Sequence, residues 1–191
     1  MNRSEAPARR PAARRAMIAA CLLLPVAVAL AIYLTGRALT PDPESGLFGA
    51  HDTEAVDLKA RLGSALLCLA LIQVLLALWM YRRLPLAGAA PRPVRTVHRI
   101  IGLLAFLLSA PIAYHCLVTY GVETTDARVT THSITGCVLY GAFVAKVLVV
   151  RGRRLPGWTL PLVGGVLACA IALLWYTAAL WALNGDSSPG F

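Results

Sequence analysis

Four histidines carry most of the acid–base and metal-binding chemistry that this sequence offers. Three of them lie in apolar surroundings: His98 in VHRIIGLLAF, His115 in PIAYHCLVTYG and His132 in THSITGCVLYG. Imidazole is a frequent ligand of haem iron, zinc and copper. An ionisable side chain inside a long apolar stretch is a functional candidate by default, because placing it in lipid is costly. The fourth, His51, lies among acidic residues, and we expect it to be solvated.

The elements that would position these histidines are five long apolar blocks. The chain has 191 residues, of which 58% are hydrophobic and 14% charged, whereas soluble domains are roughly half apolar and about a quarter charged. Each block is close to the ~20 residues with which a helix crosses a ~30 Å hydrocarbon layer. We therefore predict an all-α integral membrane bundle of five transmembrane helices, at about residues 16–34, 62–81, 97–120, 131–150 and 160–183.

The ends of the chain are predicted to lie outside this bundle. Residues 1–15 are rich in Ala, Pro and Arg and are predicted to be a disordered cytoplasmic segment, and residues 184–191 an extracytoplasmic tail. The basic start followed by an apolar block also has the order of a signal peptide. Against cleavage, that apolar block is full length and no small-x-small site follows Tyr33. Residues 16–183 are therefore predicted to form one transmembrane domain.

Charge predicts the orientation of the bundle. Arginines precede the first helix and fill the connections between helices 2 and 3 and between helices 4 and 5, while eight of the nine acids lie in the other connections and the tail. By the positive-inside rule this predicts an N-in/C-out topology. The net charge of +9 thus reports topology and contact with the lipid bilayer, and we predict no nucleic-acid binding. Sixteen Arg against two Lys is typical of a GC-rich bacterial genome and predicts a bacterial plasma membrane.

His115 and His132 are the strongest candidates for a shared site. They flank one short outer connection, so they are predicted to lie at matched depth on helices 3 and 4. Two neutral imidazoles so placed are what bis-histidine ligation of haem b requires. In that arrangement Gly136 would let the macrocycle approach helix 4, Arg128 would pair with a propionate and Tyr140 would supply a hydrogen bond.

Other interpretations of the histidines remain open from the residues alone. Histidines at helix ends also lie in the headgroup region, bonded to water. Packed neighbouring helices are only ~8–10 Å apart, so helices 3 and 4 would have to splay to hold a haem. A copper or zinc ion bound with help from Cys116 or Cys137 is a third interpretation. None of the five cysteines lies in a CxxC or CxxCH pair, so neither a zinc ribbon nor covalent c-type haem is predicted.

His98 has no predicted histidine partner. Seventeen residues of helix separate it from His115, which places the two about 25 Å apart at opposite faces of the membrane. A second haem site at His98 would need another ligand, and helices 1, 2 and 5 contain no histidine. His98 would instead bind a quinone headgroup or a propionate, or cap its helix, and we expect the cap.

The motifs around these residues resemble known families. HRIIGLLAFLLS followed by AYH resembles the histidine-bearing helices of cytochrome b561 and ferric-reductase-like membrane proteins, which carry b-type haem in helical bundles. The b561 pattern of four histidines on four helices is not met, so this resemblance implies one haem near the outer face. Residues 17–183, above all YHCLVTYG, TTDARV and HSITGCVLYGAFVAKVLVVR, resemble more closely a family of uncharacterised five-helix bacterial membrane proteins.

The predicted function is therefore electron transfer through one haem b, with a quinone or a periplasmic redox protein as partner. Such a chain would be an electron carrier or a subunit rather than a stand-alone enzyme. The alternative is a cofactor-free accessory subunit of a larger respiratory or transport complex. Small residues such as Gly63, Gly102 and Gly136 suit that role, because they permit close helix contacts. A transporter or channel ranks last, because paired intramembrane acids and discontinuous helices are missing from the pattern.

Overall fold

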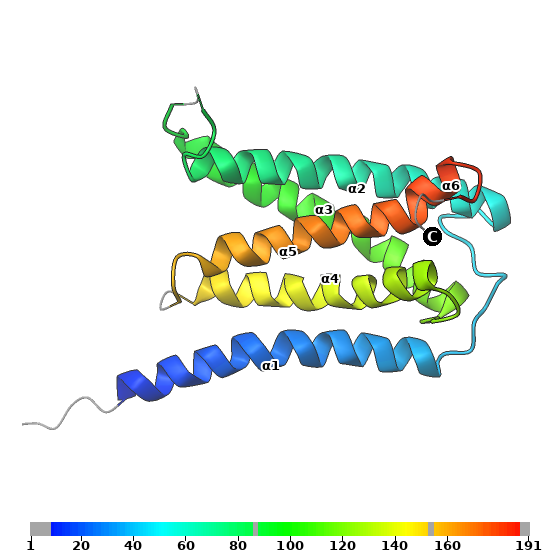
Figure 1. Cartoon of the computed structure of the whole chain (residues 1–191), viewed down its shortest axis with the longest axis horizontal. Helices are drawn as coiled ribbons and strands as arrows, with labels where there is room; N and C mark the ends of the chain where they lie inside the picture. Colours follow the sequence, from blue (N-terminus) through cyan, green and yellow to red (C-terminus); the bar gives the residue numbers. More distant parts are fainter. Residues whose placement is uncertain (1–8, 86–87, 153–154, 188–191) are drawn as a thin grey trace, which may run out of the picture.

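The structure is a computed structural model that describes residues 9–85, 88–152 and 155–187. Figure 1 shows long, roughly aligned helices joined by connections at their two ends. The described ranges contain helices, turns and irregular connections, and their only β-type pairing is an isolated bridge between Leu47 and Ala50. The elements are α1 (Arg9–Ala38), α2 (Asp52–Met80), α3 (Arg92–Tyr120), α4 (Ala127–Arg151), α5 (Thr159–Leu174), the π-helix η1 (Trp175–Leu180) and α6 (Trp181–Leu183).

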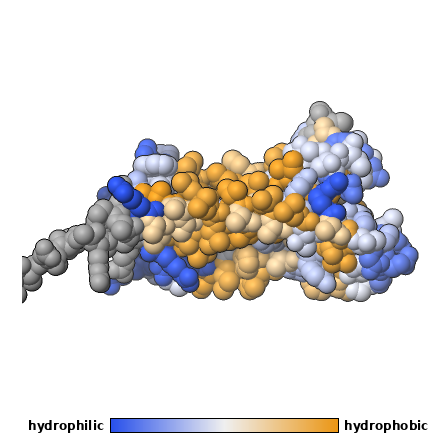
Figure 2. Space-filling model, turned by 90° about the horizontal axis from the view of Figure 1, so that it is seen from below, coloured by the Kyte–Doolittle hydropathy of each residue, from blue (hydrophilic) through white to orange (hydrophobic). Residues whose placement is uncertain are grey.

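Five of these rods are long and apolar enough to cross a membrane. They are α1 to α4 and the continuous rod Thr159–Leu183, which contains α5, η1 and α6. On the face seen in Figure 2, apolar side chains cover the middle of the molecule and hydrophilic side chains lie toward both ends. A helix suits this setting because all of its backbone polar groups are bonded internally. The predicted all-α bundle is confirmed, and it indicates a multi-pass membrane protein.

The helices extend beyond the apolar blocks that the sequence showed. α1 begins at Arg9, inside the segment for which we predicted disorder, and α2 begins at Asp52 instead of residue 62. Ala and Arg favour helix, and acids in a first turn, here Asp52 and Glu54, complement the helix dipole. α4 starts early because the Asp126 side chain accepts a hydrogen bond from Val129 N at 2.9 Å. Two parts of the predicted end segments lie outside the described residues: residues 1–8, for which we predicted disorder, and residues 188–191 of the tail.

We name the two ends of the bundle by their charge. At the acidic end, α1 and α3 finish and α2 and α4 begin, and the connections there carry Asp42, Glu44 and Asp126. At the basic end, α2 and α4 finish and α3 and α5 begin, and Arg82 and Arg151 lie there. In Figure 1 the acidic end is on the right and the basic end on the left.

The packing order differs in one respect from the order along the chain. α1 packs on α4, α4 on α5, and α2 on both α3 and the α5–η1 rod. The short connection between helices 4 and 5 predicts that they are antiparallel neighbours, and the structure confirms it. The short connection between helices 3 and 4 predicts the same for that pair, and α3 and α4 do contact each other through side chains, although the backbones of their described residues do not approach closely. Large side chains hold them apart: Phe106 of α3 meets Tyr140 and Phe143 of α4 with ring centroids 6.4 and 5.2 Å apart.

Small residues allow the closest helix contacts. At Gly141 of α4, an added Cβ would lie 2.6 Å from the backbone oxygen of Pro25 in α1. Only a glycine fits there without moving one of the two helices. The buried core next to this contact is made of small and aliphatic side chains from α2 to α5: Leu66, Ala70, Ala105, Leu139, Ala142, Leu167, Ala170 and Ile171.

Candidate functional site

His115 lies in the last turns of α3 at the acidic end and is only 2% exposed. Its Nε2 is 3.0 Å from the backbone oxygen of Ser45, in the connection between α1 and α2. A carbonyl oxygen can only accept, so Nε2 carries the proton and donates. The other nitrogen, Nδ1, is 3.4 Å from the hydroxyl of Thr119, one turn further along α3. Nδ1 is therefore the nitrogen of His115 that keeps a lone pair.

His132 lies in the second turn of α4 and points to a different element. Its Nδ1 is 3.0 Å from Thr177 Oγ1 in η1. The Thr177 hydroxyl already donates to Leu173 O at 2.8 Å, so in the contact with His132 it accepts and Nδ1 donates. Nε2 of His132 then keeps its lone pair. Histidine ligands of metals commonly have one nitrogen held by such a hydrogen bond and the other free to bind the ion.

Arg128 binds the same π-helix one turn before His132. Its Nη1 donates to Thr177 O at 2.8 Å, and its guanidinium carbon lies 4.1 Å from the centroid of the Trp181 ring. A π-helical stretch disturbs the regular backbone ladder and often marks a functional position. Thr177 is fully buried at 0% exposure and binds Arg128 and His132 through separate oxygens. Its only signal in the sequence is a threonine in the largely apolar stretch WYTAAL.

Lys59 of α2 lies near His115 at the acidic end. Its Nζ donates to the Tyr120 hydroxyl at 3.0 Å, and the Tyr120 ring lies edge-on to His115 with centroids 6.4 Å apart. The ammonium interacts electrostatically with both His115 and His132. One cation thus acts on both imidazoles, although their hydrogen-bond partners differ. Lys59 and Ser45 lay in a stretch that the sequence predicted to be a connection, so neither was a candidate.

Gly136 and Tyr140, which were predicted to border a haem, take part in contacts between helices. Gly136 faces α5, because an added Cβ would lie 4.0 Å from Leu174 Cδ2. Tyr140 donates its hydroxyl to Ser109 Oγ of α3 at 3.3 Å. All five cysteines are free. Within the described ranges, no three His, Cys, Asp or Glu side chains gather as a metal-binding group, so the copper or zinc interpretation finds no such cluster there.

His98, the candidate at the basic end, does not cap its helix. α3 begins at Arg92, with Pro91 at the capping position and no side-chain cap bond, so the predicted cap is wrong. The backbone oxygen of His98 accepts from Gln73 Nε2 of α2 at 2.6 Å. Two buried atoms of this pair, Gln73 Oε1 and His98 Nδ1, have no hydrogen-bond partner among the described residues. Lys146 of α4 interacts electrostatically with His98.

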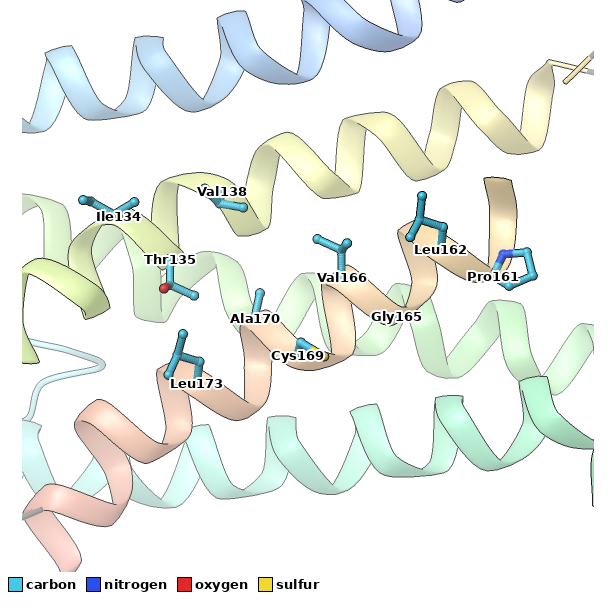
Figure 3. Close-up of a pocket in the computed structure, with 10 residues that line it drawn as sticks. All are labelled: Ile134, Thr135, Val138, Pro161, Leu162, Gly165, Val166, Cys169, Ala170 and Leu173. Atoms are coloured by element: carbon cyan, nitrogen blue, oxygen red, sulfur yellow. The ribbon is translucent and has the colours of Figure 1, made fainter. Parts of the chain in front are cut away.

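An apolar groove of about 750 Å³ lies between α4 and α5. Figure 3 shows Val138 on α4 and Val166 and Leu173 on α5 along this groove, with Gly165 leaving part of the α5 surface bare. A Cβ added at Gly164 or Gly165 would meet no described atom within 4 Å. The groove is therefore open space on the apolar surface of the bundle.

A family comparison covers nearly the whole chain. The family of unknown function DUF6529 matches residues 17–190. The chain belongs to DUF6529. No curated protein and no solved structure matches it. The predicted membership of an uncharacterised membrane family is thereby confirmed, and all three histidines of the apolar stretches lie inside the matched part of this DUF6529 chain.

The imidazole nitrogens of His115 and His132 in this DUF6529 protein are donors of the kind that haem iron binds. The packing around them shows which contacts a bound haem would displace. His132 has the tautomer of a ligand through Nε2, whereas His115 would bind through Nδ1, or through Nε2 after releasing Ser45 O. Arg128 would reach a propionate by leaving Thr177 O. Two imidazoles on helices whose backbones stand apart fit the ligand chemistry, while the aromatic side chains between α3 and α4 would have to open to admit the macrocycle.

Proposed function

We propose that this protein is a membrane electron carrier that binds one haem b near its acidic end, with His115 and His132 as the axial ligands. The observation that carries the proposal is the hydrogen bond from His132 Nδ1 to Thr177 Oγ1, which leaves Nε2 available to iron. His115 is the second inward-facing imidazole at the same end and is 2% exposed. Bound haem would supply the redox chemistry, and the protein would bind and orient it.

Each residue of the proposed site has a definite task. Thr177 would hold the His132 ring in one orientation and one tautomer, as outer hydrogen-bond partners of ligands do. Arg128 would offer its guanidinium to a propionate. Tyr140, which faces α3, would border the macrocycle, whereas Gly136, one turn beyond His132, faces α5. Lys59, which interacts with both imidazoles, would oppose a further positive charge on either ring and so favour the neutral forms that bind iron.

The charge distribution and the histidine motifs support a proposed topology, location and electron partner for the protein. The arginines of the basic end favour its placement in the cytoplasm, which makes the topology N-in/C-out, and the Arg-rich composition favours a bacterial plasma membrane. The likeness of HRIIGLLAFLLS and AYH to cytochrome b561 and ferric-reductase-like proteins favours electron transfer over enzymatic turnover. A quinone in the bilayer or a periplasmic redox protein would be the electron partner.

The test is a dithionite-reduced minus oxidised absorption spectrum of the detergent-purified full chain, expressed with haem supplementation. We expect the sharp alpha and Soret bands of a low-spin b-type haem, near one per chain. A folded protein with a flat spectrum would contradict the haem proposal.

A second candidate function is that of a cofactor-free accessory subunit of a larger membrane complex. The observation in its favour is the open groove between α4 and α5, whose apolar lining and bare Gly165 suit a transmembrane helix of a partner. Gly165→Leu would fill this groove while leaving the haem site untouched. Under this proposal the substitution releases the partner in native electrophoresis of the solubilised membrane, and the purified protein is colourless.

A further inference from the structure

The basic end contains a pair of buried polar atoms that nothing in the described chain satisfies. Gln73 Oε1 of α2 and His98 Nδ1 of α3 are both buried and have no hydrogen-bond partner. Such groups are rare in native proteins, and inside a membrane there is no bulk water to compensate them. A bound group that supplies the missing hydrogen bonds would remove this cost.

The orientation of the Gln73 amide defines what the missing group must be. The amide atom 2.6 Å from His98 O must be the nitrogen, because a backbone carbonyl accepts and cannot donate. The free atom of Gln73 is therefore its oxygen, and this oxygen needs a donor. His98 Nδ1 can donate or accept according to its tautomer, so it can meet either the same group or a second one.

The surroundings favour a small group that enters from the lipid. Gly102 of α3 faces the amide, since an added Cβ would lie 3.5 Å from Gln73 Oε1. The missing side chain leaves room for about one methyl group beside the unsatisfied oxygen, which is itself buried. Ile100 and Leu103, which flank this turn of α3, are 54% and 57% exposed on the apolar surface of the bundle. Lys146 brings a positive charge near His98, which favours a ligand oxygen that carries partial negative charge.

We propose that Gln73 and His98 form a binding site for the hydroxyl headgroup of a lipid-soluble quinol, with a quinol hydroxyl donating to Gln73 Oε1. The oxidised quinone has only carbonyl oxygens there and cannot donate, so the site prefers the reduced form. Gln73 and Gly102 are the specificity-determining residues. In naming a quinol as the redox partner this inference rests on the proposed function, but binding requires no haem, so each can fail without the other.

The experiment is calorimetric titration of the detergent-purified full chain with decyl-ubiquinol, kept reduced under anaerobic conditions, and separately with decyl-ubiquinone. We expect saturable binding of both, with the quinol about tenfold tighter because the quinone leaves Gln73 Oε1 without a donor. Gln73→Met keeps the length of the side chain but removes its oxygen, and should abolish the preference for the quinol.

A matched pair of glycine variants tests the position of the headgroup. Gly102→Ala should weaken quinol binding about tenfold by filling the space beside Oε1, whereas Gly164→Ala, at an open position of α5, should leave binding unchanged. Absence of saturable quinol binding would mean that water satisfies the two atoms and would overturn the proposal. Equal affinity for quinol and quinone in the wild-type chain would overturn it as well. The haem spectrum of the same samples reports separately on the proposed function.

Discussion

The two ends of the bundle treat their buried polar side chains differently. At the acidic end, the buried His115 donates to Ser45 O and the half-buried His132 donates to Thr177 Oγ1, while His51, which is exposed, has its Nδ1 3.1 Å from Glu44 O. At the basic end, Gln73 and His98 leave two buried atoms without partners among the described residues. Burial of a histidine in a membrane bundle is therefore not by itself the mark of a ligand site. The two ends differ in whether their buried polar atoms have hydrogen-bond partners among the described residues.

The difference arises from what each end offers as an acceptor. At the acidic end the connection between α1 and α2 folds back over α3, where Asp42 N donates to Val118 O at 2.9 Å. This brings the free carbonyl oxygens of Glu44 and Ser45 to two histidines. The π-helix supplies the third histidine partner through Thr177. At the basic end the Gln73 amide binds the backbone oxygen of His98 and no other group among the described residues.

The largest expected effect is on haem absorbance, which should depend on the histidines of the acidic end and not on His98 at the basic end. His132→Ala or His115→Ala should abolish the low-spin haem bands, because each removes one axial ligand, whereas His98→Ala should leave them intact. Reduced minus oxidised spectra of the three purified variants make the comparison. An unchanged spectrum in either acidic-end variant would disprove the ligand assignment.

The next effect concerns stability at the acidic end. Thr177→Val removes the hydroxyl that bonds both His132 and Leu173 O and leaves a buried donor unpaired, which should lower the free energy of unfolding by about 1–3 kcal/mol. Thr177→Ser keeps the hydroxyl and should lose much less. Denaturation in detergent, followed by circular dichroism, measures both variants. Equal stability of the Val and Ser variants would show that the hydroxyl is unimportant.

A smaller effect of opposite sign is expected at the basic end. Gln73→Met removes an unsatisfied oxygen together with one hydrogen bond to His98 O. In the absence of ligand the two changes oppose each other, and we expect a net gain of up to about 1 kcal/mol in the free energy of unfolding. The same denaturation assay applies. A clear loss of stability would show that Gln73 Oε1 is already satisfied in the ligand-free protein, and the contrast between the ends would disappear.

The smallest effect is expected at Lys59. Its hydrogen bond to the Tyr120 hydroxyl is exposed, and exposed interactions of a lysine contribute less than about 1 kcal/mol. Lys59→Met keeps the aliphatic part of the side chain and should leave the unfolding free energy nearly unchanged. If bound haem has neutral ligands beside this cation, the variant should nevertheless lower the reduction potential measured by redox titration. An unchanged potential would place the haem away from Lys59.

The spans were predictable because the bilayer imposes their length. A helix in lipid must satisfy its own backbone and present apolar side chains over the full hydrocarbon thickness, so each block was visible in composition alone. Helix ends were less predictable, because Asp126 and the first turn of α2 continue the helices with polar residues that the apolar pattern does not register. Helices 3 and 4 were predicted from a short connection to be neighbours, and their contact is made by side chains, since the bulk of Phe106 and Tyr140 sets the spacing of the backbones.

The sequence alone determined the fold class, the five spans and the three histidines inside them. It could not determine which atom each histidine faces. Ser45 and Thr177, the partners of His115 and His132, are 70 and 45 residues away along the chain, and Gln73 is 25 residues from His98. Such pairings depend on how each helix is rotated about its axis and where it crosses its neighbours. Only the packed bundle decides these, because side chains throughout the chain jointly determine the spacing and rotation of every helix.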